Sequence, residues 1–260
     1  MLDGGSELFI SDLHLSAHEP TTVARFLQFL DGPARQASRL TLLGDLFDYW
    51  AGDDDLADPF NTRIATSLRQ LSDHGVAIDL MVGNRDFLIG RAFASASGLT
   101  LLSDPCVRTV GGIKTVLTHG DTLCTDDDAY QHFRAQVRNP AWQATFLARP
   151  LADRKQEIEA LRARSEIEKR IKPLEIMDVN PTAVADMLQT HQATAIIHGH
   201  THRQGTHPLS VAGRECRRWV LGDWDSSPGN ALQCDSTDWH WLYFSQFAHS
   251  CDNDPHHQPE

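Results

Sequence analysis

The amino-acid sequence predicts an α/β layered fold, because strand-like runs alternate with helix-period segments along much of its 260 residues. Residues 8–11 (LFIS) and 40–44 (LTLLG) are short apolar runs that indicate buried strands. Residues 22–36 and 61–74 instead carry apolar side chains at helical spacing, which predicts a helix after each of these strands.

The same strand pattern returns later in the chain, after an interruption. Strands are predicted at residues 77–83, 114–120, 194–199, 218–222 and 239–244. Residues 121–178 contain no strand-like run, and we interpret them as an inserted helical lid. The predicted organisation is a core of residues 1–120 and 179–247, the lid at 121–178, and a polar, disordered tail at 248–260.

The charge balance restricts the class of ligand. A formal net charge of −12 argues against a general nucleic-acid or anionic-membrane binder. Residues 134–172 are an exception, because ten basic residues face five acidic ones there. This basic segment suggests one localised anionic ligand, although mixed Arg and Glu along a helix can also form a solvated face.

Cysteine usage and apolar runs indicate the compartment. The five cysteines are scattered without CxxC spacing, which predicts neither a disulfide framework nor a structural zinc site. The first dozen residues lack the basic flank and apolar core of a signal peptide, and no run approaches the roughly 18 apolar residues of a spanning helix. We therefore expect a reducing, cytoplasmic environment.

Several of the predicted strands end in aspartate, histidine or asparagine. Each such residue alone has an ordinary explanation, since Gly-Asp is a common turn and a histidine after a strand is usually structural. Together they converge in space, because layered α/β sheets place their sites beyond the carboxyl ends of neighbouring strands. Imidazole and carboxylate ligands suit Mn²⁺, Fe²⁺ or Zn²⁺, and seven ligands suit two ions that share a carboxylate. The residues are Asp12, His14, Asp45, Asn84, His119, His200 and His202.

The order DxH…GD…GN…HG…GHxH in this chain resembles that of the calcineurin-like metallophosphoesterases. The resemblance implies a four-layer α/β/β/α sandwich with a dinuclear metal site bridged by Asp45. One metal would be held by Asp12, His14, Asp45 and His202, and the other by Asp45, Asn84, His119 and His200. His198 falls outside the family's ligand positions, and we interpret it as a strand-end residue behind the ligands.

Longer blocks, including GNRDFLIGRAFA, LTHGDTLCTDDDAYQHFR and EIMDVNP, are similar to the UDP-2,3-diacylglucosamine pyrophosphatases of lipid A biosynthesis. The similarity spans about residues 7 to 245. It implies an enzyme with two Mn²⁺ ions, attached peripherally at the cytoplasmic face of the bacterial inner membrane. The sequence leaves the oligomeric state open, with a monomer favoured, and the net charge argues against a nucleic-acid partner. The implied reaction is water attack on the α-phosphorus of UDP-2,3-diacylglucosamine, giving UMP and 2,3-diacylglucosamine 1-phosphate (lipid X). The implied substrate contacts are Asn84, Arg85, Asp127, Tyr130, Ser165, Lys169, Lys172 and His200.

The resemblance assigns catalytic roles to Asn84, Arg85 and His200. Superfamily nucleases and phosphatases usually have GNHD where this chain has GNRD, with a histidine that assists an alkoxide leaving group. A phosphate monoester leaves more easily and needs charge neutralisation, which the guanidinium of Arg85 supplies. An alternative is a structural pair between Arg85 and Asp86. The alternative functions are another dinuclear phosphodiesterase or nuclease, or a metal-free scaffold on the same fold.

Overall fold

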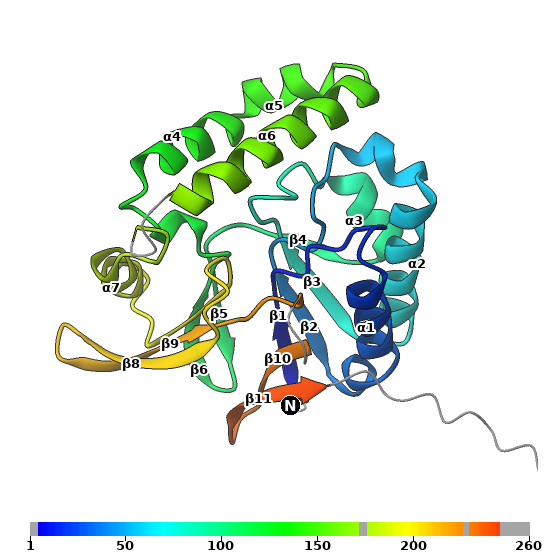
Figure 1. The fold of residues 1–260 in the computed structure, drawn as a ribbon. Helices are drawn as coiled ribbons and strands as arrows, with labels where there is room; N and C mark the ends of the chain where they lie inside the picture. The colour runs from blue at the N-terminus through cyan, green and yellow to red at the C-terminus, as the bar shows by residue number, and fades with distance from the viewer. Residues whose placement is uncertain (1–4, 172–175, 226–228, 245–260) are drawn as a thin grey trace, which may run out of the picture.

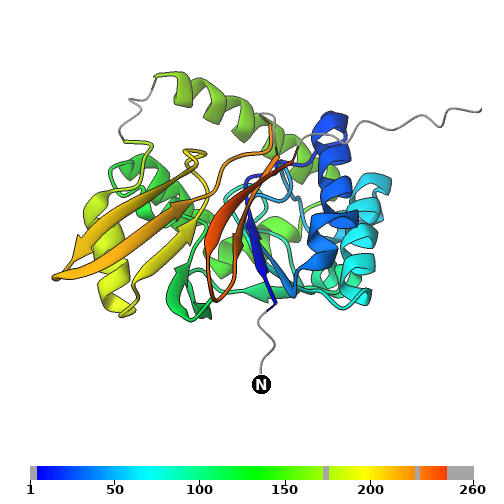
Figure 2. The same cartoon turned by 90° about the horizontal axis from the view of Figure 1, so that it is seen from below.

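The computed structural model describes residues 5–171, 176–225 and 229–244. Its elements form four layers, in which three helices, two sheets and one further helix follow one another (Figures 1 and 2). The first sheet has the order β11-β10-β1-β2-β3-β4, with β1 to β4 parallel and β10 and β11 antiparallel. Its strands are β1 (Glu7–Ile10), β2 (Arg39–Leu43), β3 (Ala77–Met81), β4 (Thr100–Leu102), β10 (Gly229–Cys234) and β11 (Trp239–Phe244).

The second sheet has the order β5-β6-β7-β9-β8, and its three central strands run parallel. The predicted α/β fold is therefore confirmed, with two mixed sheets face to face. The strands β4, β5, β8 and β10 were not predicted from the sequence. The strands of this sheet are β5 (Cys106–Val110), β6 (Ile113–Leu117), β7 (Ala195–His198), β8 (Gly205–Val211) and β9 (Arg214–Val220).

Alternating side chains of the central strands fill separate apolar layers, because successive residues of a strand point to opposite faces. Leu8 and Ile10 pack toward the outer helices, whereas Phe9 packs between the sheets with Leu117 and Ile197. Burial on both faces explains why these strands read as continuous apolar runs. The outer helices are α1 (Pro20–Asp31), α2 (Pro59–Asp73) and α3 (Arg91–Ser97) on the first sheet, and α7 (Pro181–Thr190) on the second.

The helix predicted at residues 22–36 is shorter than expected. It ends at Asp31, and Pro33–Gln36 form a separate 3₁₀ turn, because Pro33 cannot donate the hydrogen bond that would continue the helix. Helix α2 begins at Pro59, where the side chain of Asp58 accepts a bond from the backbone N–H of Phe60. A second 3₁₀ turn covers Asp53–Ala57.

Residues 121–171 form a run of helices, here called the helical segment. It arches over the carboxyl ends of β1, β2, β3, β6 and β7 (Figure 1). Trp142, Phe146 and Ile158 anchor the segment to the apolar core of the first sheet. Within the described residues we find no helix long and apolar enough to cross a bilayer. The elements are η3 (Asp121–Leu123), α4 (Asp128–Val137), α5 (Pro140–Leu147) and α6 (Leu151–Ile171).

Candidate metal centre

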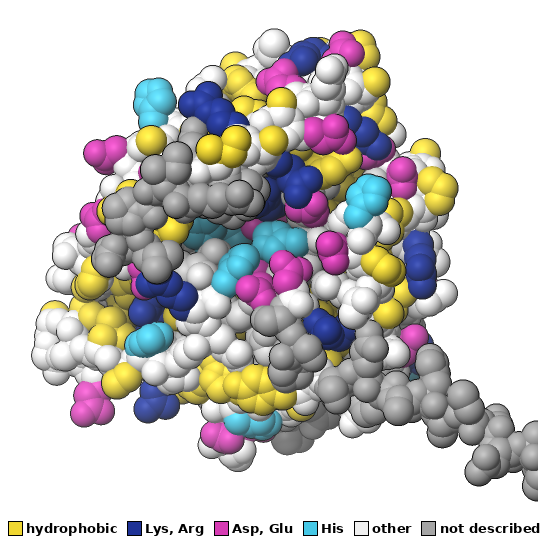
Figure 3. All heavy atoms as spheres, viewed as in Figure 1, with side chains coloured by type: hydrophobic (Ala, Val, Ile, Leu, Met, Phe, Trp, Pro, Cys, Tyr) yellow, Lys and Arg dark blue, Asp and Glu magenta, His cyan; other side chains and the backbone are white. Residues whose placement is uncertain are grey.

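The predicted ligands lie in the turns that directly follow five strands, beneath the helical segment. In Figure 3, histidine and acidic side chains gather in a hollow at this place. Five ligands (Asp12, His14, Asp45, His200 and His202) have left-handed backbone conformations, with φ between 48° and 67°. Such backbone is costly for residues other than glycine and persists where the surrounding structure enforces it, often at functional sites. These tight turns bring side chains from distant parts of the chain together.

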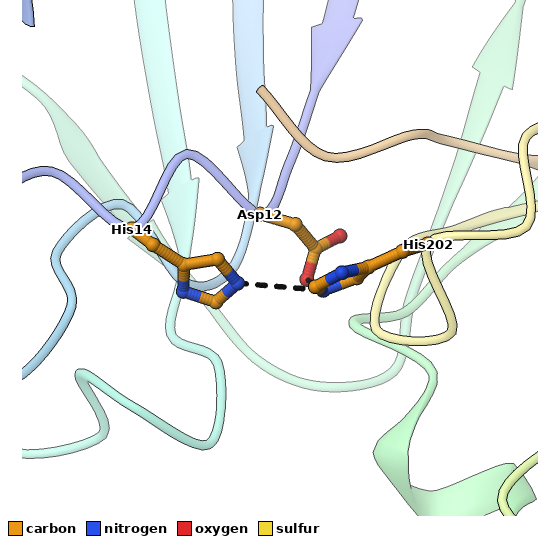
Figure 4. A group of neighbouring side chains, drawn as sticks. All are labelled: Asp12, His14 and His202. Carbon is orange, nitrogen blue, oxygen red and sulfur yellow. Dashed lines mark hydrogen bonds and ion pairs between the residues drawn. The ribbon is translucent and has the colours of Figure 1, made fainter. Parts of the chain in front are cut away.

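Asp12, His14 and His202 form one group, drawn in Figure 4. The Nε2 atoms of His14 and His202 lie 3.3 Å apart, and His202 Nε2 lies 3.3 Å from Asp12 Oδ1. The other oxygen of Asp12 accepts bonds from Ser11 Oγ at 2.6 Å and from the backbone N–H of His200 at 2.9 Å. One oxygen of Asp12 is thus held in place while the other faces the two imidazoles.

Asn84, His119 and His200 form a second group next to Asp45. Asn84 Oδ1 lies 3.0 Å from His119 Nε2 and 2.8 Å from His200 Nδ1. Asp45 lies between the groups, with Oδ1 at 3.8 Å from His119 Nε2 and Oδ2 at 3.9 Å from His14 Nδ1. The seven predicted ligands are therefore brought to one place.

The imidazole orientations fit metal ions. His119 Nδ1 lies 2.9 Å from the carbonyl oxygen of Leu43, which can only accept, so Nδ1 carries a proton. In its neutral form, which is the form that binds metal, His119 directs the lone pair of Nε2 at Asn84 Oδ1. Asn84 Oδ1 is also an acceptor, so the two atoms face each other without a proton between them. His202 repeats this arrangement, since Asp223 Oδ2 lies 3.2 Å from its Nδ1 and its Nε2 faces Asp12. A cation between the facing acceptors satisfies both groups, and metal-ligating histidines commonly donate their other nitrogen in this way.

The spacings within the two groups support the same conclusion. Ligand atoms about 2.0–2.2 Å from one ion lie about 3.0 Å apart in octahedral and about 3.4 Å apart in tetrahedral geometry. The contacts within the two groups fall between 2.8 and 3.3 Å. His14 Nδ1 is buried without a hydrogen-bond partner in the described part of the chain. The donor set thus fits two divalent ions.

The protein without metal concentrates negative charge at this place. Burial raises the pKa of Asp45 to about 7. Burial would lower the pKa of His119, but the charges of Asp45, Asp121 and Asp12 raise it to about 9. The pKa of His202 reaches about 10, because hydrogen bonds to Asp12 and Asp223 outweigh its burial. The site therefore binds protons tightly when no cation neutralises it.

Glycines allow the ligand turns to approach one another. A Cβ atom on Gly83 would lie 2.1 Å from Asp45 Oδ1, and one on Gly199 would lie 2.3 Å from Asp12 Oδ2. The glycines of the GN and HGH motifs therefore make space for the carboxylates. This need for space explains glycine at these two positions better than turn formation alone.

The GNRD turn is held from within. Asp86 is fully buried and accepts bonds from the backbone N–H groups of Gly83, Leu46 and Phe47 at 2.7, 2.7 and 3.4 Å. Asp86 therefore supports the turn through backbone N–H groups. The backbone N–H of Arg85 donates to Asp45 Oδ1 at 2.8 Å.

The predicted substrate contacts lie partly within the described structure. The ring of Tyr130 stacks on that of His200, with centroids 5.7 Å apart and planes inclined by 30°. The side chain of Asp127 caps α4 by accepting from the backbone N–H of Tyr130. Ser165 lies in α6 and is half-buried. Lys169 belongs to α6, with no description of its side chain, and Lys172 lies outside the described residues.

Much of the basic segment pairs with acids rather than facing solvent. Arg162 contacts Asp48 at 2.5 Å, and Lys155 contacts Asp55 at 2.7 Å. The guanidinium of Arg154 is buried and reaches a carboxylate and two backbone carbonyls. The excess of positive charge therefore attaches α6 to Asp48 and to the acidic GDDD stretch at 52–55, and the charge count alone does not require an anionic ligand.

Two further residues of the site were not predicted. Asp223 faces His202, and Asp121 accepts from Tyr130 Oη at 2.9 Å and from Arg134 Nε at 2.7 Å. The signal was present in the sequence, because each aspartate follows a glycine at the end of a strand-like run, as Asp45 does.

Comparison with known proteins agrees with this geometry. The model of the calcineurin-like phosphoesterase family matches residues 8–204, a range that contains both ligand groups. The chain therefore belongs to the calcineurin-like phosphoesterases, a class of hydrolases whose membership implies a dinuclear site for divalent metals.

Three relatives of high identity share one name. The chain is 51% identical to UDP-2,3-diacylglucosamine hydrolase of Aromatoleum aromaticum over 86% of this chain and 91% of the relative. The hydrolase of the same name from Pseudomonas aeruginosa is 48% identical over 89% of this chain and 95% of the relative. That from Nitrosococcus oceani is 46% identical over 90% and 92%, respectively. A solved archaeal phosphodiesterase matches 92% of this chain and 99% of its own at 11% identity, with a TM-score of 0.44.

Proposed function

We propose that this protein hydrolyses the pyrophosphate bond of UDP-2,3-diacylglucosamine in lipid A biosynthesis, releasing UMP and lipid X. The observation that carries the proposal is the pair of ligand groups at the strand ends, with Asp45 between them. The printed name of relatives about half identical over most of the chain supports the choice of substrate.

The proposed cofactors are two Mn²⁺ ions. Asp12, His14 and His202, with Asp45, would hold the first metal. Asn84, His119 and His200, with the same Asp45, would hold the second metal. Asp45 suits the bridging role because its two oxygens face different histidines, His14 and His119. When bound, such ions activate water and neutralise charge on the phosphoryl oxygens.

The protein's own residues then hold and orient the substrate. The backbone of Arg85 is fixed by its bond to Asp45, so the guanidinium extends from an anchored turn beside the metal ligands. A guanidinium offers a permanent charge and paired donors to a diphosphate, which suits a leaving group that needs no proton. Asn84 and His200 contact each other at 2.8 Å and would hold the phosphoryl group at the second metal.

We propose that the helical segment acts as a lid for the acyl chains and as the contact with the cytoplasmic face of the inner membrane. Phe133, Leu147 and Ile167 are large apolar residues of this segment with 40%, 39% and 61% of their surface exposed. Exposed apolar groups on helices that also carry basic residues suit an interface with acyl chains and anionic headgroups. Peripheral binding by a monomer would require no spanning helix.

The central test is an assay of product identity in water enriched in ¹⁸O. Protein stripped with a chelator and reloaded with Mn²⁺ should convert UDP-2,3-diacylglucosamine into UMP and lipid X, with the label in UMP. Label in lipid X would move the attack to the other phosphorus. Hydrolysis of a simple phosphodiester without any turnover of the nucleotide lipid would replace the proposal with a general dinuclear phosphodiesterase.

Two variants test the roles of Arg85 and of the lid. Arg85→His should lower turnover of the nucleotide lipid at unchanged metal content, and unchanged turnover would contradict the charge-neutralising role.

Leu147→Asp should weaken sedimentation with vesicles of phosphatidylethanolamine and phosphatidylglycerol. Ile113→Asp is the matched control, because Ile113 is equally exposed at 40% and lies in the second sheet, outside the helical segment.

A further inference from the structure

One face of α4 is attached to the loop that carries His119. Tyr130 and Arg134 are four residues apart and therefore lie on the same side of the helix. Both donate to Asp121 Oδ2, at 2.9 Å from the Tyr130 hydroxyl and 2.7 Å from Arg134 Nε. Gln131 adds a bond of 2.8 Å from its amide nitrogen to the backbone carbonyl of Asp121. Because Asp121 follows His119 by two residues, α4 is fixed directly to one ligand turn.

The same helix reaches two more ligand turns. Arg138, one turn beyond Arg134, donates from Nη2 to the carbonyl oxygen of Gly83 at 2.8 Å and lies 3.8 Å from Asp121 Oδ2. Gly83 immediately precedes Asn84. The Tyr130 ring stacks on His200 while its hydroxyl is held by Asp121. Side chains of α4 and of its C-cap residue Arg138 therefore contact the turns of Asn84, His119 and His200.

The other group of ligands has different supports. Asp12 is held by Ser11 and by the backbone of His200, and His202 is held by Asp223. The backbone N–H of His14 donates to the carbonyl of Asp45 at 3.0 Å. These supports come from the core, whereas the second group is also held from the helical segment.

We propose that Asp121, with Tyr130 and Arg134 of α4 and Arg138 at its C-cap, forms the positioning set of the second metal, and that the first metal does not depend on it. Asp121 is a positioning residue, since it acts through Tyr130 and through the turns it fixes. Its carboxylate is fully buried, and its Oδ2 collects two donors and the nearby charge of Arg138. An amide at this place loses the charge that pairs with the two arginines, which weakens the attachment of α4 to the ligand turns. The inference rests on the dinuclear centre of the proposed function.

The test is a Mn²⁺ titration of metal-free protein, followed by calorimetry and by electron paramagnetic resonance, which separates single from coupled Mn²⁺ ions. In Asp121→Asn we expect the second ion to bind about 10–100-fold more weakly, as is typical when an outer-shell partner is lost. The first ion should bind with wild-type affinity and give the signal of an isolated ion. Asp128→Asn is the matched control, because Asp128 is an exposed carboxylate in the first turn of the same helix. It should bind both ions as the wild type does.

Equal weakening of both ions in a folded Asp121→Asn protein, or no weakening of either, would overturn the inference. If this variant does not fold, Arg138→Lys takes its place in the same titration, since it keeps the charge but loses the geometry of the bond to Gly83. A second-ion affinity that this variant leaves unchanged would likewise overturn the inference. A wild type that binds fewer than two ions would instead remove the dinuclear centre itself, so the two failures are distinguishable.

Discussion

Gly83→Ala provides a direct test of the ligand geometry. Gly83 lies between β3 and Asn84, and its Cα faces the turn of Asp45. A methyl group here would lie 2.1 Å from Asp45 Oδ1 and 2.4 Å from the backbone nitrogen of Asp45. The nitrogen belongs to the backbone, and the carboxylate oxygen is buried and held by the backbone N–H of Arg85, so the two turns must separate.

The size of the effect follows from this overlap. Contacts of a Cβ atom below 3.0 Å essentially do not occur, so the Asp45 carboxylate and Gly83 must move apart by about 0.9 Å. Metal–ligand distances tolerate about 0.2 Å, so a bridging carboxylate cannot follow this movement and keep both ions. We expect turnover to fall at least about 100-fold, as for a misplacement of about 1 Å in an active site. Overpacking should cost about 1–3 kcal/mol, or roughly 2–12 °C in Tm, which leaves the protein folded at 25 °C.

Metal content, Tm and turnover would be measured on the same preparation. Gly205→Ala is the matched control, because Gly205 opens β8, away from the centre, and its nearest new contact is the flexible end of His207 at 3.1 Å. Two bound ions and turnover within about threefold of wild type in Gly83→Ala would refute the proposed bridging geometry.

Four further outcomes are expected. Asp223→Asn replaces the carboxylate that orients His202 with a neutral amide and should weaken the first metal about 10–100-fold in equilibrium dialysis, whereas an unchanged affinity would reject this orienting role. Arg154→Met leaves buried carbonyls without a donor and should lower the free energy of unfolding in urea by about 2–4 kcal/mol, whereas a loss below about 0.5 kcal/mol would show that other contacts hold α6. Burial raises the pKa of the Cys124 thiol to about 12, so iodoacetamide at pH 8 should modify it only in unfolded protein, and fast labelling of native protein would contradict its burial. Burial alone would lower the pKa of both histidines, but nearby carboxylates raise that of His119 to about 9 and that of His202 to about 10. Binding two ions at pH 8 should therefore release about two protons, and metal affinity should rise with pH up to about 10. Calorimetry in two buffers counts these protons, and a count near zero would contradict the orientation of the two rings.

The ligand turns could be predicted because two signals coincide at each of them. The first signal is an apolar run, which marks a buried strand. The second is that the polar residues after the run are only Asp, His or Asn, and turn formation alone does not require these types. Asp121 and Asp223 carry the same signal, yet they were missed because a ligand and its support look alike in sequence. Only the distances separate them, since Asp223 faces the Nδ1 of His202 and not the side that faces Asp12.

Other elements were missed because their burial depends on partners. In β5 the pattern is broken by Arg108, whose guanidinium donates to Asp79 at 2.6 Å and to Glu7 at 2.8 Å between the two sheets. A charge at a strand position reads as exposed until its partners are known. Strand β8 contains Pro208, which is tolerated because β8 is the edge of its sheet. The acidic partners of the basic segment could not be predicted either, because they lie far away in the sequence.

The contacts of the basic residues show that the helical segment is fixed to the core rather than free to open. At one end of the helical segment, Arg154 and Arg162 attach α6 to the acidic residues that follow β2. At the other end, Arg138 holds the turn that presents Asn84. A segment anchored at both ends to the ligand-bearing core cannot open as a free flap without disturbing a metal ligand. Acyl chains would then enter along the exposed apolar side of a fixed cover, and removal of the segment would be expected to cost metal affinity as well as lipid recognition. On the proposed function, we therefore expect lipid specificity and metal affinity to be coupled through α4 and its C-cap residue Arg138.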